Sequence, residues 1–336
     1  MTVERTMADA WASRTKRGGL RWSWHSIAPF LTCARSYKYG IVDDLVPLDY
    51  RAPLALGSAF HAGMEAVFKR LKAEQERSGR AFWRPSDRGT ETLAGEAGQA
   101  IRAYEGVAEE DRQKALRLAG AYVYGDDEGR GGPIDFAEWK VLAVEEAVEA
   151  DLGVLLPEVP GVRRPKVPWT QTPDLVVLAG GPQVPDYFHG LWAVDHKTAA
   201  RLSGNSVAGY RHDGQALSIV ATLRAAGVPV RGFIPNVITK TKTVRVVRDY
   251  VEFTEEETSA WAADLAYWQK AIRGRVARRG PWPRTPTACM GRYGECEFLS
   301  LCWDGAGAEG AFGKRSEVKL ADVAYGGEPT VWEVAE

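Results

Sequence analysis

Cysteine is scarce in this chain, with only four residues in 336, and no secretory signal precedes them. A disulfide framework is typical of secreted proteins, so this scarcity favours thiols that bind a metal over thiols that form disulfides. The chain also lacks any apolar run close to the roughly 18 residues that a membrane-spanning helix needs. We therefore expect a cytoplasmic protein with no membrane partner.

Large net charge and nucleotide-binding motifs are absent as well. The net charge is -1, so overall charge does not indicate a nucleic-acid binder. The sequence contains no P-loop, no Rossmann fingerprint and no internal repeat, which excludes a helicase motor of the P-loop kind. With 45% hydrophobic and 26% charged residues, the composition is that of an ordinary globular protein with a large core.

The tripeptide Asp195-His196-Lys197 is the most informative motif that the chain does contain. It ends an apolar run, residues 191–198, that is typical of a buried strand. Side chains two residues apart project to the same face of a strand. The pattern therefore predicts Asp195 and Lys197 side by side on one face and His196 on the other.

A second carboxylate, Asp174, begins the preceding apolar run, residues 172–179. The Gly/Pro-rich segment between the two runs predicts a hairpin. Pairing centred near residues 184 and 185 would set Asp174 directly opposite Asp195. Two carboxylates suit a hard cation such as Mg²⁺, and a neighbouring lysine can position water or stabilise charge on a phosphoryl oxygen. These residues predict hydrolysis of a phosphodiester.

Pro173-Asp174 followed by Asp195-His196-Lys197 resembles the signature of the PD-(D/E)xK nuclease superfamily, and in particular its RecB-like iron-sulfur branch. The resemblance implies an α/β, restriction-endonuclease-like fold with a mixed central sheet flanked by helices. It implies Mg²⁺ or Mn²⁺ as cofactor, Asp174 and Asp195 as metal ligands, and Lys197 as a catalytic group. It also implies DNA as substrate, either single-stranded or at duplex ends, and recombination or helicase proteins as partners.

Two further segments support that branch. Ser58 is expected to cap a helix with His61 in its first turn, where the resemblance makes His61 a metal ligand or a metal-proximal group. The apolar stripe of this helix is Phe60, Met64, Val67, Phe68 and Leu71.

Gln215, on the helix after the Asp-x-Lys strand, is expected to orient the lysine or contact substrate. The tyrosine that the family often carries one turn later is missing. Glu145 or Glu149, on the strand before Asp174, could assist the metal.

The four cysteines are Cys33, Cys289, Cys296 and Cys302. Their spacing lacks the tight C-x2-C pairs of common zinc sites. In RecB-like nucleases one N-terminal and three C-terminal cysteines hold a [4Fe-4S] cluster, and the resemblance implies the same here. Zinc stays open as the alternative. Such a cluster would join the N- and C-terminal segments and close a long loop, so its role would be structural.

A basic stretch lies next to the C-terminal cysteines. Residues 265–294 contain no acidic side chain. Their basic residues are an electrostatic footprint for phosphate, although a basic helix face is as often simply solvated. The candidate DNA contacts are Arg273, Arg275, Arg278 and Arg279.

The order of elements indicates one decorated domain. We expect a mobile segment at 1–20, a nuclease domain at 21–303 that includes a helical part at 57–120, and a C-terminal tail at 304–336. The expected helices are 57–77, 88–120, 205–226 and 255–279. The expected strands, besides the two of the hairpin, are 140–149, 230–239 and 244–253.

The sequence as a whole predicts a divalent-metal-dependent DNA nuclease, an exonuclease rather than an endonuclease, with a structural iron-sulfur cluster. A non-cleaving DNA-binding or assembly subunit of a recombination complex is the alternative from a different class. The paired carboxylates with their lysine disfavour it, since a binding module has no need of that arrangement. An RNA nuclease is a third reading that no feature of the sequence excludes.

Overall fold

The computed structural model describes residues 22–48, 52–126, 129–200, 208–278, 280–291 and 294–314. The expected mobile segment at 1–20 and most of the expected tail lie outside these residues. No helix among the described residues is both long enough and apolar enough to cross a membrane.

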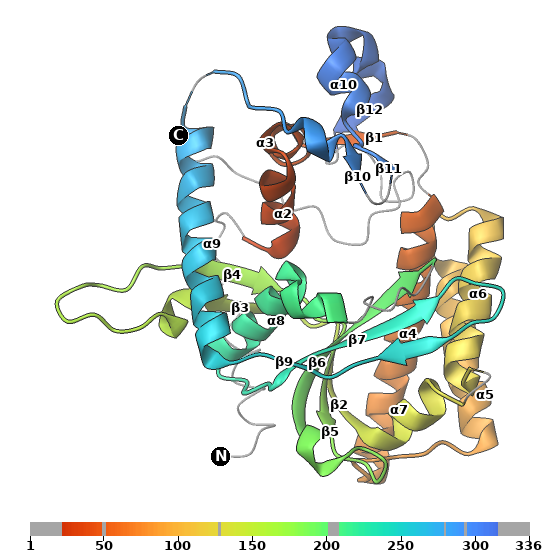
Figure 1. Ribbon diagram of the computed structural model, residues 1–336. Helices are drawn as coiled ribbons and strands as arrows, with labels where there is room; N and C mark the ends of the chain where they lie inside the picture. The colour runs from red at the N-terminus through yellow and green to blue at the C-terminus, as the bar shows by residue number, and fades with distance from the viewer. Residues whose placement is uncertain are drawn as a thin grey trace.

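A mixed central sheet organises the molecule (Figure 1). Its path is β2-β5-β6-β7-β8, and β9 pairs with β7 beside β8. Only the β6–β7 pair is parallel, and all other pairs are antiparallel. The strands are β2 (Trp139–Val144), β5 (Leu175–Ala179), β6 (Gly190–Ala199), β7 (Gly232–Thr239), β8 (Val246–Arg248) and β9 (Val251–Glu252). The predicted fold class is confirmed.

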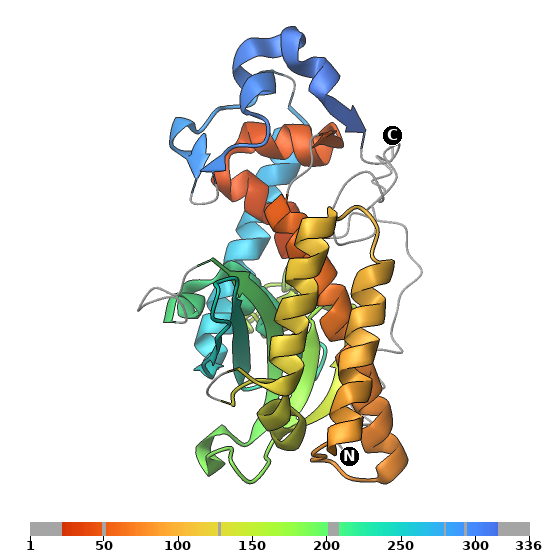
Figure 2. The ribbon, with the colours of Figure 1, turned by 90° about the vertical axis from the view of Figure 1, so that its right-hand side faces the viewer.

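Helices cover both faces of this sheet, as Figure 2 shows from the side. One face packs against α4 (Ala52–Ser78), α5 (Asp87–Ala103), α6 (Glu109–Tyr124) and α7 (Gly132–Glu138). The other face packs against α8 (Gly214–Ala225). Alternation along β6 divides the strand between the two cores, because Trp192 and Val194 join the first and Ala193 joins the second.

A third core lies beyond α8 and holds the N-terminal helix in place. It joins α2 (Trp24–Thr32) and α9 (Glu255–Val276) to the short hairpin β3 (Val148–Asp151) and β4 (Pro168–Gln171), through residues such as Ile27, Trp169 and Leu265. Capping boxes begin α2 at Ser23 and α9 at Thr254. These caps fix where both helices start.

The cysteine-bearing segment sits at the top of Figure 1 and is built from short elements. Residues far apart in sequence meet there, because β1 (Leu45–Pro47) pairs with β12 (Phe312–Lys314). The remaining elements are α3 (Ala34–Tyr37), a π-helical turn (Lys38–Val42), β10 (Met290–Gly291), β11 (Gly294–Glu295), α10 (Leu299–Asp304) and a 3-10 helix (Gly305–Ala311).

Several predicted boundaries were wrong. The first long helix begins at Ala52, so Ser58 lies inside it and does not cap it, and His61 lies in its third turn. The stripe from Phe60 to Leu71 is nevertheless buried as predicted, because an earlier start does not change helical phase.

Two predicted elements are in fact pairs of elements. The helix expected at 88–120 breaks into α5 and α6 around Gly106, which adopts a positive φ of 73°. The strand expected at 140–149 divides at Glu145 into β2 and β3, which belong to different sheets. The last expected strand, 244–253, is β8 and β9.

Candidate active site

The predicted register of the hairpin is present. In the β5–β6 pair Leu175 lies opposite Val194 and Val176 opposite Ala193. Continuing this antiparallel register by one residue sets Asp174 opposite Asp195. Both carboxylates are buried, at 8% and 2% exposure. The hairpin thus carries two acids to the same point on the sheet.

Glu145 extends this pair of acids into a row across three strands. A bulge at Leu142 shifts the β2–β5 register, so that Val144 pairs with Leu175 and Glu145 follows beside Asp174. The backbone N–H of Glu145 donates to the carbonyl oxygen of Asp174 at 2.9 Å. Glu145 adopts a positive φ of 49°, which costs a non-glycine residue about 1–3 kcal/mol. This turn aims the Glu145 carboxylate at the site.

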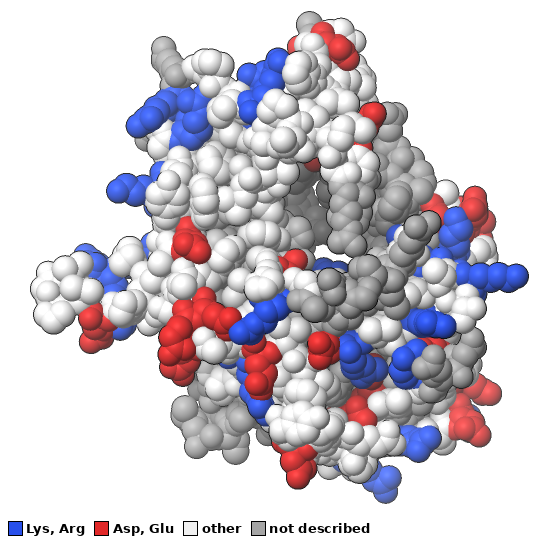
Figure 3. Space-filling model, viewed as in Figure 1, with Lys and Arg blue, Asp and Glu red and all other residues white. Residues whose placement is uncertain are grey.

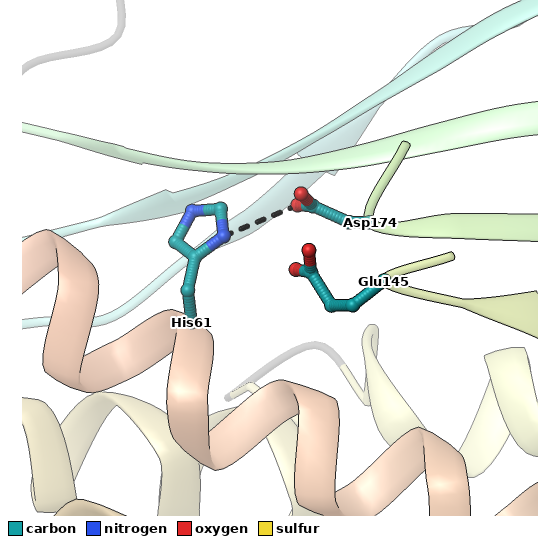
Figure 4. Close-up of side chains that lie close together, drawn as sticks. All are labelled: His61, Glu145 and Asp174. Atoms are coloured by element: carbon teal, nitrogen blue, oxygen red, sulfur yellow. Dashed lines mark ion pairs between the residues drawn. The ribbon is translucent and has the colours of Figure 1, made fainter. Parts of the chain in front are cut away.

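His61 approaches the same point from helix α4. Its Nδ1 lies 3.3 Å from Oδ2 of Asp174. His61, Glu145 and Asp174 each offer one ligand atom, and the three atoms lie within 4.8 Å of one another. Figure 4 shows the three side chains converging from α4, from the end of β2 and from the start of β5. An octahedral Mg²⁺ site separates opposite ligand atoms by about 4.2 Å, so this group fits a divalent ion.

Asp195 lies beside that group and faces the lysine. Its Oδ2 lies 2.5 Å from Nζ of Lys197, and its Oδ1 accepts from Nε2 of Gln215 at 3.2 Å. Lys197 Nζ in turn donates to Oε1 of Gln215 at 3.0 Å. Gln215 therefore contacts both members of the Asp195–Lys197 pair.

The position of Gln215 follows from how helix α8 begins. The Asp213 side chain caps the helix by accepting from the N–H of Ala216 at 2.9 Å. Trp24 packs against the backbone of Gly214, and a Cβ atom there would meet the indole ring at 2.2 Å. Only glycine leaves room for this contact, which holds α2 against the start of α8 one residue before Gln215.

The pKa values of the three acids are shifted from their usual values, upward for Glu145 and Asp195 and downward for Asp174. Burial and the nearby carboxylate of Asp174 raise the pKa of Glu145 to about 8. Burial likewise raises the pKa of Asp195, to about 6, although Lys197 opposes the shift. Burial also works against ionisation of Asp174, but His61 holds the pKa of that carboxyl well below its usual range. The raised pKa of Glu145 means that a divalent cation binding there near neutral pH would displace a proton.

The two basic groups stay charged. Burial lowers the pKa of His61, but Asp174 more than offsets it, and the pKa rises to about 9. Burial opposes the charge of Lys197 as well, yet Asp195 and Asp174 raise the pKa of the ammonium above its usual value. Lys197 is therefore a cation and not a proton acceptor at neutral pH.

His196 points to the opposite face of the sheet, as predicted, and belongs to a buried polar chain that the sequence did not indicate. Its backbone N–H donates to Oδ2 of Asp174 at 2.6 Å, while its ring stacks on Phe68 of α4. Burial lowers the pKa of His196 to about 3, so the ring is neutral. Nδ2 of Asn236 lies 3.1 Å from His196 Nδ1 and 3.0 Å from the hydroxyl of Tyr122.

The chain continues into a buried ion pair. The Tyr122 hydroxyl donates to Asp135, and Asp135 pairs with Arg248. Asp135 is fully buried, and the Arg248 guanidinium lies 5.0 Å from the centre of the Trp139 ring. This chain ties α6 and α7 to β6, β7 and β8 behind the acids.

A second residue that the sequence analysis missed is His25, in the first turn of α2. It is exposed, yet surrounding protein atoms and the ammonium of Lys197 lower its pKa. Its neighbour Trp24 packs on Gly214. The contact between α2 and α8 brings His25 close enough for the charges of Lys197 and Asp174 to act on it. Glu149, the other acid considered for the metal, lies on β3 opposite Thr170 and outside the ligand group.

The four cysteines line one pocket, contributed by the start of α3, the segment before β10, the turn before α10 and α10 itself. The backbone N–H of Cys296 donates to the carbonyl of Cys289 at 2.9 Å. Burial opposes a thiolate at Cys33, but N–H groups, including that of Ser36, lower its pKa below the usual value. Burial and the nearby charges of Glu297, Cys33 and Cys289 raise the pKa of Cys296. The thiols are thus close enough to repel one another when ionised.

The arginines of the basic stretch near the cysteines differ in what their side chains contact. Arg275 lies 4.9 Å from the centre of the Trp282 ring and donates to the carbonyl of Gly280 at 3.0 Å, so it supports the turn after α9. Arg273, near the end of α9, is exposed but lies 5.4 Å from the centre of the Trp22 ring, and Arg278 is exposed just after the helix. Arg279 lies outside the described residues. Lys and Arg side chains gather at the upper left of Figure 3.

One of two comparisons with known proteins gives a match. A search of curated proteins found no match. The sequence model of the PD-(D/E)XK nuclease superfamily matches residues 21–303, which is most of the chain and includes every residue of the acid row. The chain therefore belongs to the PD-(D/E)XK nuclease superfamily.

Proposed function

We propose that this protein is a divalent-metal-dependent DNA exonuclease. The observation that carries the proposal is the convergence of His61, Glu145 and Asp174 beside the Asp195–Lys197 pair. Two buried acids and a half-buried one in a single row are costly unless a cation neutralises them. Lys197 supplies one cation beside the acids, and the carboxylate oxygens together with the His61 nitrogen can bind a second cation, a metal ion.

In this proposal His61, Asp174 and Glu145 hold Mg²⁺ or Mn²⁺, and Asp195 completes the site from the neighbouring strand. The bound ion supplies Lewis-acid activation of a phosphoryl oxygen and of water. The protein prepares the ligands in advance. His61 Nδ1 and the N–H of His196 both approach Oδ2 of Asp174, which fixes the orientation of that carboxylate.

Lys197 acts as a charge-stabilising and water-positioning group. Its raised pKa keeps it protonated, so it stabilises negative charge on the phosphoryl oxygens and does not remove a proton. Gln215 and Asp195 restrict its ammonium to one position. This restriction is the preorganisation that electrostatic catalysis requires.

Placement in the RecB-like branch, with DNA and not RNA as substrate and with action at strand ends, rests on the resemblance of the motifs to that branch. The depth of the acids supports action at ends. Asp195 is 2% exposed and Asp174 8% exposed, so a free terminus reaches them more readily than the middle of a rigid duplex.

We also propose that Cys33, Cys289, Cys296 and Cys302 hold a structural [4Fe-4S] cluster. The four cysteines line one pocket, and one N-terminal cysteine with three C-terminal ones is the layout that the resemblance to the RecB-like branch associates with such a cluster. A single structural zinc ion is the alternative that elemental analysis distinguishes.

The test is cleavage of end-labelled DNA, single-stranded and duplex, with Mg²⁺, Mn²⁺ or EDTA. We expect products that shorten from one end and that require the metal. Asp195→Asn should be inactive, while Asp264→Asn, an exposed acid on α9, serves as the matched control. Metal-independent cleavage would refute the mechanism. DNA binding without cleavage in any metal would favour a non-cleaving subunit. Preferential cleavage of RNA would make the protein an RNA nuclease.

A further inference from the structure

An arm projects from the body of the molecule between β3 and β4 (Figure 1, left). It comprises residues 152–167. Its first part, a 3-10 turn from Leu152 to Leu155, packs on α9 in the third core. Its outer part, residues 157–166, is exposed apart from Arg164, which is half-buried. We call residues 157–166 the tip.

The neck of the arm is closed by hydrogen bonds. Oδ1 of Asp151 accepts from the N–H of Gly153 at 2.9 Å and from the N–H of Val167 at 2.7 Å. The N–H of Leu152 donates to the carbonyl of Val167 at 2.9 Å. At Gly153 the two chains approach so closely that a Cβ would meet the carbonyl of Pro165 at 2.1 Å. The tip is therefore presented on a fixed support.

A tight turn ends the arm. Val159 and Val162 form an isolated bridge, with the N–H of Val162 donating to the carbonyl of Val159 at 3.0 Å. Pro160 and Gly161 occupy the corner, and Gly161 has the positive φ of 76° that suits such a turn. Proline at 157, 160 and 165 restricts the backbone further.

The tip is strongly basic for its size. It contains Arg163, Arg164 and Lys166 against a single acid, Glu158. Arg164 lies 3.3 Å from that acid. Arg163 and Lys166 are exposed, and the described residues record no ion pair for either. Figure 3 shows Lys and Arg side chains on this projection beside one acidic group, with further acidic groups on the body near its base.

The β3–β4 hairpin that carries the arm starts and ends near the acid row. Glu145 lies three residues before β3, and Asp174 lies three residues after β4. The root is held to the N-terminal helix region by the N–H of Thr170, which donates to the carbonyl of Trp22 at 2.7 Å. A rigid basic tip is thus connected directly to both carboxylates.

We propose that the tip binds the phosphate backbone of duplex DNA at a distance from the cleavage site, an inference that rests on the proposed nuclease function. Two exposed cations complement phosphate. The fixed neck favours a stiff ligand, because duplex DNA, with a persistence length of about 150 base pairs, spans a fixed tip and a fixed site without bending. A flexible single strand gains less from such a support.

The length of the arm limits where this contact falls. Gly161 and Asp174 are 13 residues apart. An extended chain spans at most about 3.5 Å per residue, so the tip lies within about 45 Å of Asp174. Phosphates of one strand advance about 3.4 Å each along the duplex, so the contact falls within about 13 base pairs of the site.

The experiment measures binding in EDTA, so that cleavage does not interfere, with a duplex of about 30 base pairs between about 50 and 200 mM salt. The variant is Arg163→Ala/Lys166→Ala. Each lost phosphate contact makes the plot of log affinity against log salt concentration less steep by about 0.9. For the two lost contacts, the drop in affinity between about 50 and 200 mM salt should be about twelvefold smaller in the variant than in the unaltered protein. Binding of a single strand should change little, because a flexible strand gains less from the fixed neck.

The matched control is Arg84→Ala/Arg88→Ala, which removes two exposed cations next to α5, at the other side of the molecule in Figure 1. An unchanged salt slope in the tip variant would overturn the proposal and leave the tip to a protein partner. Equal losses in tip and control variants would overturn it too, since bulk charge would then explain them. Cleavage with Mg²⁺ is scored separately: a protein that binds long duplex through the tip yet cuts no DNA keeps this inference while the nuclease function fails.

Discussion

The acid row and the cysteine pocket are assembled in different ways. The acids stand on neighbouring strands of a sheet with two packed faces, and the register of β2, β5 and β6 brings them together. The cysteines come from turns and from helices as short as four residues. Long strands supply their own order, whereas short elements bury little apolar surface and depend on a cross-link. Loss of a ligand should therefore affect chemistry in the first region and structure in the second.

The largest effect should follow Asp195→Asn. The substitution removes a charge from the acid row and leaves shape unchanged, so the fold persists while cleavage falls by about a thousandfold or more, on the order of 4 kcal/mol. Single-turnover cleavage with Mg²⁺ and thermal unfolding measure the two properties. Cleavage at the rate of the Asp264→Asn control would move the active site elsewhere.

Lys197→Ala should come next. Loss of a preorganised cation costs about 3 kcal/mol of transition-state stabilisation, or roughly a hundredfold in rate, while metal binding is retained. Lys197→Arg should also be slow, because a planar guanidinium cannot take the position that Gln215 and Asp195 give to a compact ammonium. Lys72→Ala, on the outer surface of α4, is the control. Full activity in either Lys197 variant would make the lysine a bystander.

Cys296→Ser tests the other side of the comparison. We expect the protein to lose its iron and brown colour and to become susceptible to proteolysis near both ends, with stability lower by about 2 kcal/mol, since the cluster closes a long loop. DNA binding should weaken as the adjoining arginines shift. Elemental analysis of anaerobically purified protein measures the metal, with the exposed Ser300→Ala as control. One equivalent of zinc without iron would replace the cluster by a zinc site, and no metal at all would return the cysteines to ordinary packing residues.

The pH dependence of metal binding sharpens the comparison further. Glu145 and His61 have pKa values raised to about 8 and about 9, so in the metal-free protein their contribution to stability is present at low pH and is lost as pH rises through those values. A divalent ion must displace these protons, so its affinity should rise with pH, by up to about tenfold per pH unit for each proton released. Mn²⁺ titrations between pH 6 and pH 9 measure the slope. A flat profile would exclude both residues as ligands.

The smallest effect should come from Tyr122→Phe in the buried chain behind the acids. Removing the hydroxyl leaves Asp135 and Asn236 each without one partner, at about 1–3 kcal/mol of stability. Cleavage by the folded fraction should change little. Tyr124→Phe, two residues along the same helix and exposed, is the control. A large loss of kcat with normal stability would give this chain a direct part in the chemistry.

The hairpin was predictable because its two signals, alternation and a turn centre, are local. They placed Asp174 opposite Asp195 and His196 on the other face. Glu145 was only one of two candidates, because the bulge at Leu142 and the left-handed turn leave no pattern in the sequence. The start of the helix that carries His61 was predicted wrongly, because a serine such as Ser58 looks like an N-cap in the sequence even when it lies inside a helix.

Contacts between distant segments were beyond the sequence. The chain from Asn236 through Tyr122 and Asp135 to Arg248 joins side chains from four elements, and each of its residues reads locally as an ordinary strand or helix residue. The four cysteines could be grouped because the sequence contains no others, but the sequence does not show how the turns that carry them come together. The [4Fe-4S] cluster and the RecB-like branch stay predictions.

Calorimetric titration of Mn²⁺ into the purified protein and into Asp174→Asn tests the central claim most directly, because Asp174 contacts both His61 and the backbone of His196. We predict that the unaltered protein binds Mn²⁺ with release of protons and cleaves DNA in the same preparation, and that the variant does neither while unfolding at a similar temperature. Undiminished Mn²⁺ binding and cleavage by Asp174→Asn would contradict the assignment of this site.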